Sequence, residues 1–336
     1  MAAEALSVAE FFADHTFRMV FFGTAVIGLV AAALGSFAYL RKQSLISDVI
    51  SHAALPGTLG AFLIAVTLLG VNGRSMVVLM TGAIVAGSLA VAAAQYVTRA
   101  TKLSIDAAMA LTLSLFFGAG MLLMRVIANH PFPGKGGVQD YLFGNASVIT
   151  RADLIASISV GALALVLMIV FWKEFTLRTF DPDHASVAGF SGRVVDGLMF
   201  TTIVIAIVIG VKAVGLVLMV AFVVTPPAAA RQWTRTLPAM VALAGAFGAV
   251  GSGLGAYLSI AVADVPTGPL IVLTQFAILV VSLLCAPRRS VVLRAWGRVR
   301  QRRRLRRDLD AERRVLAGAE ASAGAGGEGR SEGSGA

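Results

Sequence analysis

The chain has 336 residues, of which 57% are hydrophobic and 14% charged, and its mean hydropathy is +0.84. These values are typical of a polytopic membrane protein and exclude a soluble globular domain. The formal net charge of +10 does not indicate a nucleic-acid partner, because the arginines gather between Arg288 and Arg314, directly after the last apolar run. A basic cluster in that place is typical of the cytoplasmic flank of a membrane span, so we expect contact with a lipid bilayer and no nucleic acid.

Apolar runs long enough to cross a bilayer recur along the whole chain. At roughly 20 residues per span we place about nine of them, with about eight to about ten as the range. They cover residues 17–40, 46–71, 76–97, 105–127, 154–172, 194–210, 214–230, 240–263 and 270–286. The count changes if residues 142–150 form a span of their own rather than a short re-entrant piece, or if 194–230 is one bent span. The expected fold is therefore an all-α polytopic membrane domain over residues 1–286, followed by a basic and then Gly/Ser/Glu-rich cytoplasmic tail over 287–336 that is partly disordered.

Lysines and arginines gather in every second connection between these runs. The basic connections carry Arg41 and Lys42, Arg99 and Lys102, Lys173 and Arg178, Arg231 and Arg235, and finally the arginine cluster of the tail. Under the positive-inside rule these connections face the cytoplasm. We therefore expect the N-terminus outside and the C-terminus inside.

The second apolar run contains an acid and a histidine, Asp48 and His52. Their i, i+4 spacing places both side chains on one face of a helix, within reach of one metal ion. Ionisable groups inside a membrane span are costly, so a functional role is the first hypothesis, and a polar pair that only fixes packing is the alternative. The single cysteine, Cys285, excludes a multi-cysteine metal cluster, so a metal site would use histidine, carboxylate and backbone oxygen.

Prolines interrupt two of the expected spans. Pro56 has no N–H, so the carbonyl of His52 loses its helical partner, and Pro226 with Pro227 has the same effect in the run over 214–230. Paired proline-interrupted spans point to a transport path between them, while a kink that serves only packing is the alternative.

The cytoplasmic segment Phe180–Phe190 has the pattern of a short capped helix. Asp181 suits the N-cap, Pro182 the first helical position, and Gly189 the end. A helix this short is marginal alone, so it is expected to dock into a partner, with an ordinary surface helix as the alternative. The chain contains no G-x-x-x-x-G-K-[ST] motif and is not expected to hydrolyse ATP by itself.

These segments resemble a known family. The stretch LRKQSLISDVISHAALPG, Leu40–Gly57, is similar to the signature of the ABC-3 family of metal-ion permeases, which import manganese, zinc or iron. FDPDHASVAGF resembles that family's cytoplasmic coupling segment, VGLVLMVAFVVTPPAAAR its proline-bearing late span, and GAYLSIAVADVPTGPLIVL its last extracellular turn. The chain departs from the pattern at Ser47, usually glycine, and at Phe222 and Pro227.

The resemblance implies a role for particular residues. Asp48 and His52 take the metal-coordinating positions inside the membrane. The segment that meets the ATPase supplies Asp181, Pro182, Asp183, Ala185, Ala188 and Gly189. The two alanines are the small residues expected to sit in a cleft of that partner.

The resemblance also implies a function: the permease subunit of an ATP-binding-cassette importer in a bacterial-type plasma membrane, working by alternating access. Its expected partners are separate ATPase subunits, an extracytoplasmic metal-binding receptor, and a second permease copy or a paralogue. The divalent metal ion is cargo, and no permanently bound cofactor is expected. A secondary metal transporter driven by ion or proton exchange is the alternative transport mechanism, and a membrane scaffold is the alternative outside transport.

Overall fold

The computed structural model describes residues 8–43, 45–71, 73, 75–133, 151–261, 265–286 and 301, which fall in two compact units, 1–282 and 283–336. The regular structure in these ranges is entirely helical. The helices are α1 Val8–Ala13, α2 His15–Leu40, α3 Leu45–Thr67, α4 Met76–Ala100, α5 Ile105–Asn129, α7 Arg151–Val170, α8 Trp172–Phe180, α9 Pro182–Val187, α10 Gly192–Val214, α11 Leu216–Trp233, α12 Leu237–Ala261 and α13 Thr267–Cys285.

Each expected membrane run coincides with one of these helices, which confirms the all-α polytopic fold. Among the described residues, 7 helices are long and apolar enough to cross a membrane: α2, α3, α4, α5, α10, α12 and α13. An 8th span results if α7 and α8, which meet at a bend of 67°, are taken as one. The expected number of about nine is thus approximate. The alternative span over 142–150 and the tail after residue 286, apart from Gln301, lie outside the described residues.

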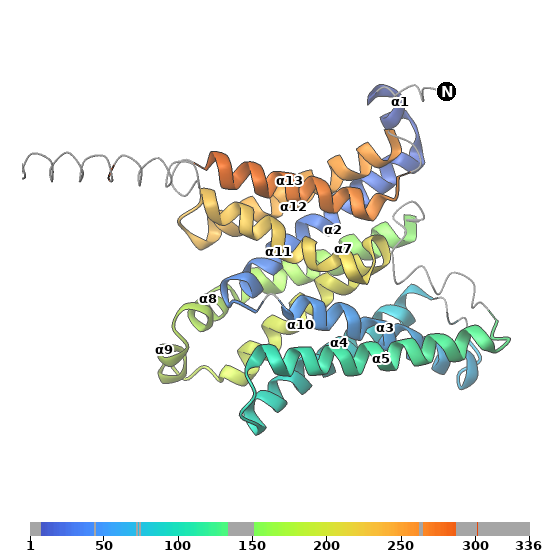
Figure 1. Ribbon diagram of the computed structural model, residues 1–336, viewed down its shortest axis with the longest axis horizontal. Helices are drawn as coiled ribbons and strands as arrows, with labels where there is room; N and C mark the ends of the chain where they lie inside the picture. The colour runs from blue at the N-terminus through green and yellow to red at the C-terminus, as the bar shows by residue number, and fades with distance from the viewer. Residues whose placement is uncertain are drawn as a thin grey trace, which may run out of the picture. The chain divides into compact units, whose positions relative to one another are not determined.

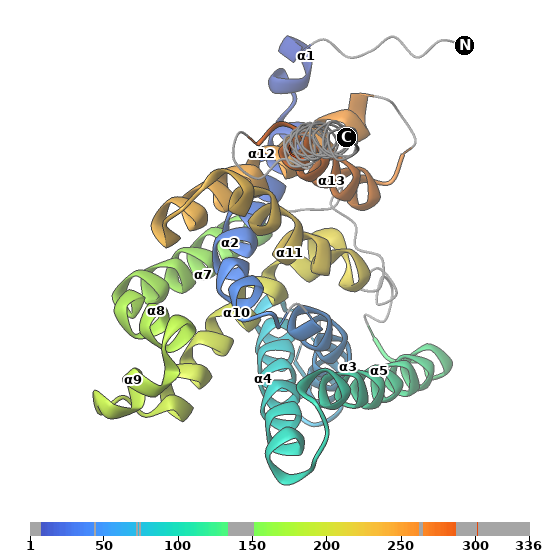
Figure 2. The ribbon, with the colours of Figure 1, turned by 60° about the vertical axis from the view of Figure 1, so that its left-hand side comes forward.

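Helix α2 is the buried centre of the first unit. In the most apolar part of α2, 72% of the residues are buried. It packs against α7, α10, α11 and α12, which surround it in Figure 2. Helices α3, α4 and α5 pack together as a second group, and α10 and α11 contact both groups (Figure 1). Helix α3, which carries Asp48 and His52, therefore contacts α11 and α10 as well as α4 and α5.

The helices continue through the prolines that were expected to interrupt them. Pro56 lies inside α3, and Pro226 and Pro227 lie inside α11. A proline removes one donor and crowds the preceding turn, but neighbouring helices can accommodate the ring and keep the helix intact in a membrane protein. At Pro56 the neighbour is α5, where a side chain at Gly120 would lie 3.0 Å from the proline Cδ. The expectation of broken spans is thus corrected, although the carbonyl of His52 still lacks its helical N–H donor.

Small residues allow the closest helix contacts. A Cβ atom at Gly28 of α2 would overlap the carbonyl of Gly248 in α12 and the hydroxyl of Ser252, and a Cβ at Gly248 would overlap the carbonyl of Gly28. Membrane helices associate through such close backbone packing, because the lipid leaves little hydrophobic driving force between them. The α2–α12 contact therefore depends on glycine on both sides.

We expect Gly28→Ala to destabilise the protein by about 1–3 kcal/mol, the usual cost of overpacking. The measurement is thermal unfolding in detergent. Gly118→Ala is the matched control, since nothing lies within 4 Å of a Cβ at that position of α5. Equal unfolding temperatures for the two variants would contradict the packing role of Gly28.

Candidate functional site

Asp48 and His52 lie side by side on α3, as their spacing predicts. The Nε2 atom of His52 is 3.2 Å from Oδ1 of Asp48, and the two side chains are 15% and 30% exposed. The imidazole also packs edge-on against Phe117 of α5, with 4.8 Å between ring centroids. The pair is therefore half-buried and held in place from two helices.

The spacing of the two donor atoms suits one metal ion. Two ligand atoms that each lie about 2.1 Å from an ion are about 3.2 Å apart when the angle at the metal is near 100°. An ion placed between Nε2 and Oδ1 would be bound by both side chains. The other ring nitrogen of His52, Nδ1, is buried and has no hydrogen-bond partner in the described part of the chain. The orientation of the imidazole is thus set by Asp48 and Phe117 rather than by a partner at Nδ1.

The pair accounts for only part of a metal coordination shell. Among the described residues, no group of three or more His, Cys, Asp and Glu side chains could hold a metal ion. Transition metals usually take four ligands or more, and oxygen and nitrogen donors suit manganese, zinc and iron alike. The remaining ligands would come from backbone oxygen, water or another chain, and the carbonyl of His52 is a suitable backbone oxygen because Pro56 leaves it without a helical N–H donor.

The prolines of α11 are part of the packed interior. Pro226 and Pro227 are buried, and the carbonyl of Val223, which Pro227 leaves without a helical donor, lies against Gly35 of α2. This contact uses the freed carbonyl for close helix packing. For Pro227, then, the contact favours the packing alternative over a lining of the transport path.

The segment after α8 forms the capped helix that its sequence predicts. The backbone N–H of His184 donates to Oδ1 of Asp181 at 2.9 Å, and Pro182 occupies the first turn of α9. At the other end the N–H of Phe190 donates to the carbonyl of Ala185 at 3.1 Å, and Gly189 has φ +84°. Glycine tolerates this left-handed backbone without strain, so the residue ends the helix as expected.

The exposed surface of α9 differs from the surface expected from the sequence. Ala185 is 2% exposed and packs inside its own chain, so it is not available to a cleft of a partner. Val187 is 85% exposed and Phe190 is 39% exposed, and these apolar residues were not singled out from the sequence. Asp181, Pro182, Asp183, Ala188 and Gly189 are exposed as well. In the sequence, the two large apolar residues near Gly189, where the helix ends, could have indicated this exposed apolar surface.

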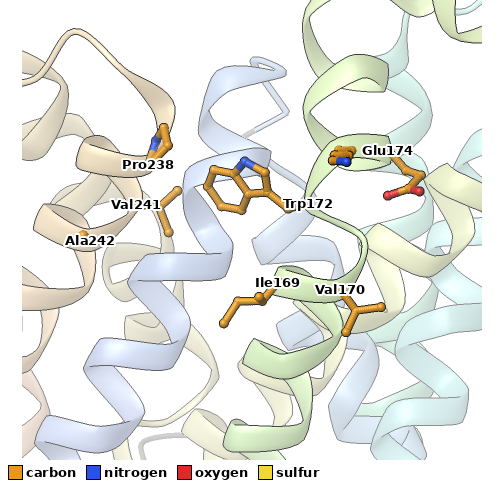
Figure 3. A pocket seen from close by; sticks show the side chains of 8 residues that line it. Ile169, Val170, Trp172, Glu174, Pro238, Val241 and Ala242 are labelled. Carbon is orange, nitrogen blue, oxygen red and sulfur yellow. The ribbon is translucent and has the colours of Figure 1, made fainter.

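Two hollows lie elsewhere on the described surface. An open groove of about 770 Å³ runs between the α7–α8 bend and the start of α12, where Val241 faces Trp172 (Figure 3). A smaller cavity of about 150 Å³ has Arg41, Gln43, Arg99 and Asp196 in its lining. Neither hollow is lined by Asp48 or His52. Because Arg41 and Arg99 come from two of the expected cytoplasmic connections, the smaller cavity shows that both connections lie at the same end of the helices.

The fold and the site together define a class of protein. A bundle of apolar helices, an ionisable pair inside one span, and a short capped helix with exposed apolar residues are the features of a polytopic membrane permease. The chain belongs to the ABC 3 transport family, whose model matches residues 13–286. It is therefore a multi-pass integral protein of the bacterial inner membrane and a permease subunit of a transporter.

Similar proteins agree with this assignment over most of the chain. The zinc transport system membrane protein TroC of Treponema pallidum (strain Nichols) is 38% identical over 294 residues, which cover 88% of this chain and 97% of that protein. The manganese transport system membrane protein MntC of Bacillus subtilis (strain 168) is 39% identical over 291 residues, which cover 87% of this chain and 66% of that protein. A solved structure, PsaBC from Streptococcus pneumoniae in complex with Fab, matches with a TM-score of 0.74 and 30% identity, over 84% of this chain and 98% of that chain.

We expect Asp181→Ala to loosen α9 by removing its N-terminal cap, at a cost of about 0.5–2 kcal/mol. Amide hydrogen exchange of the full chain in detergent should then be about 2- to 30-fold faster at His184 and Ala185, since opening rates follow the local free energy. Asp183→Asn is the matched control, because its carboxylate does not cap the helix. Unchanged protection in Asp181→Ala would mean that tertiary packing alone holds α9.

Proposed function

We propose that the chain is the permease of an importer for a divalent transition metal, manganese, zinc or iron, and that Asp48 and His52 bind the ion in transit. The proposal rests on the 3.2 Å contact between the two side chains within a membrane helix. The names of two similar proteins also support it: TroC is a zinc transport system membrane protein and MntC a manganese transport system membrane protein. The metal is cargo, so its site must release the ion as well as bind it.

A site of two protein ligands per chain suits reversible binding. A cage of four protein ligands holds zinc as a permanent structural element, whereas a site with open positions exchanges its ligands. A second permease copy, or a paralogue, packed so that its own Asp–His pair faces this one would complete the shell. A homodimer of this kind has twofold symmetry, the commonest arrangement of homo-oligomers.

The energy for transport would come from separate ATPase subunits. Helix α9 is the proposed contact, because it is short, capped at both ends and exposes Val187 and Phe190. Closure of the ATPase pair on ATP would push α9, and the helix groups would shift as rigid bodies to open the site to the other side. An extracytoplasmic receptor would deliver the ion to the outer mouth.

We expect Asp48→Ala and His52→Ala each to reduce metal uptake at least about tenfold, because even the loss of an outer partner of a metal ligand typically costs 10- to 100-fold in metal affinity. Uptake is measured in proteoliposomes that contain the permease, its ATPase and its receptor, with metal binding to the purified complex measured in parallel. Asp106→Ala is the control, since this acid lies in the first turn of α5. Full uptake and binding by the double variant at normal expression would contradict the proposal.

We expect Val187→Glu to weaken ATPase association about tenfold or more, equal to about 1.4 kcal/mol, because a charge would replace an apolar side chain at the contact. The measurement is co-purification of the ATPase, beside equilibrium metal binding, which should not change. Leu103→Glu is the matched control, an apolar-to-acid change in the α4–α5 connection, where Leu103 is 45% exposed.

Ala185→Glu separates folding from docking on the same helix. Because Ala185 is buried in its own chain, the glutamate should lower thermal stability first. If Val187→Glu keeps the ATPase bound and stimulated, α9 is not the contact and another cytoplasmic connection must serve.

A further inference from the structure

A cluster of one buried acid and two half-buried arginines lies at the start of α10. Asp196 is 5% exposed, and its Oδ1 accepts a hydrogen bond from Nη1 of Arg41 at 2.6 Å. Arg178 binds the same carboxylate through a fork, with Nε donating to Oδ1 at 3.1 Å and Nη2 to Oδ2 at 2.9 Å. Both carboxylate oxygens are engaged, so neither needs a further partner.

Each of the two arginines also lies close to a residue of α10. The guanidinium of Arg41 lies 5.3 Å from the ring centroid of Phe200, in position for a cation–π contact. The guanidinium of Arg178 lies over Gly192, where a Cβ atom would be 2.9 Å from Cζ. A side chain at residue 192 would therefore require the guanidinium of Arg178 to shift.

The two arginines come from the two segments to which the proposed function assigns roles. Arg178 lies in the last turn of α8, three residues before the cap residue Asp181 of α9. Arg41 ends α2 and begins the turn that leads into α3, the helix of Asp48 and His52. Asp196 on α10 is bound by both, so it joins the proposed ATPase contact to the helix with the metal pair.

Backbone hydrogen bonds connect the residues after Arg41 to the end of α2 and to the start of α3. The N–H groups of Arg41, Lys42 and Gln43 donate to the carbonyls of Phe37, Tyr39 and Ala38 at 3.1 Å each. The N–H of Ile46 then donates to the carbonyl of Gln43 at 3.0 Å, which ties α3 to the same turn. A force on Arg41 thus acts on the first turn of α3, where Asp48 lies.

Stability alone does not account for the cluster. Burying charges costs desolvation energy that their attraction only partly returns, and apolar residues of similar volume often replace such triads without loss. The best attested use of a buried ionic cluster is to select one arrangement of the parts that it joins.

We propose that Asp196 is a positioning residue for transport: with Arg41 and Arg178 it links α9 to the α2–α3 turn, so that ATPase-driven movement of α9 shifts Asp48 and His52. This inference rests on the proposed function, since it takes α9 as the ATPase contact and Asp48 with His52 as the metal pair.

The main test uses Arg178→Lys and Asp196→Asn in the complete complex with ATPase and receptor. Lysine keeps the charge but cannot form the fork, so Arg178→Lys changes the geometry and little else. The expected result is a fall of about tenfold in metal ions moved per ATP hydrolysed, within the usual range for coupling between sites. Metal affinity and ATPase co-purification should stay as in the parent protein.

Three controls separate linkage from a general structural role. Arg193→Gln removes an exposed charge from the same turn of α10 and should leave the ratio unchanged. Gly28→Ala lowers stability at a remote contact, and if it lowers the ratio as much as Arg178→Lys does, the proposal is overturned. The triple variant Arg41→Met, Arg178→Met, Asp196→Leu should keep its unfolding temperature and lose coupling.

The outcomes also distinguish this inference from the proposed function. An unchanged ratio in Arg178→Lys, or a coupled triple variant, overturns the role of Asp196 even if Asp48→Ala abolishes binding. Retained metal binding in Asp48→Ala, in contrast, overturns the metal pair, whatever the ratio in Arg178→Lys.

Discussion

The cost of placing charge inside a membrane protein governs how this chain uses its ionisable side chains. The structure meets that cost in two different ways. At Asp196 both carboxylate oxygens accept hydrogen bonds from arginine, and the two positive charges compensate the charge of the acid. Asp48, in contrast, contacts His52. In the described part of the chain, Nδ1 of this histidine has no hydrogen-bond partner. A charge-compensated cluster suits a mechanical link, whereas a pair with few other partners suits an ion that must bind and leave.

Close packing determines which parts of the molecule can move together. Helix α2 meets α12 through Gly28 and Gly248 with almost no space between the backbones. Helices α3, α4 and α5 form another group. Packed interfaces of this kind switch between discrete arrangements rather than deforming gradually, which is the behaviour that alternating access needs. Helices α10 and α11 contact both groups, and the Asp196 cluster lies at the start of α10.

The surface of α9 is compatible with the proposed ATPase contact, although a helix this short is marginal alone. Its ends are satisfied by Asp181 and Gly189, and its one buried residue, Ala185, anchors it to its own chain. This anchoring leaves Val187 and Phe190 facing outward, where a partner could cover them. Because α7 and α8 meet at a bend of 67°, the chain that leads into α9 runs in a different direction from α7.

The sequence by itself determined the features that depend on local periodicity and composition. Local sequence predicts the positions of the apolar runs, the shared face of Asp48 and His52, and the caps of α9. The motifs in these segments also predicted the family. Only the tertiary structure decided which distant residues meet. Asp196 and Arg41 are 155 residues apart in the chain, and no local pattern marks them as partners. For the same reason the burial of Ala185 and the continuity of α3 through Pro56 were not predictable, because neighbouring helices, rather than the segment itself, supply the contacts that cover a side chain and accommodate a proline ring.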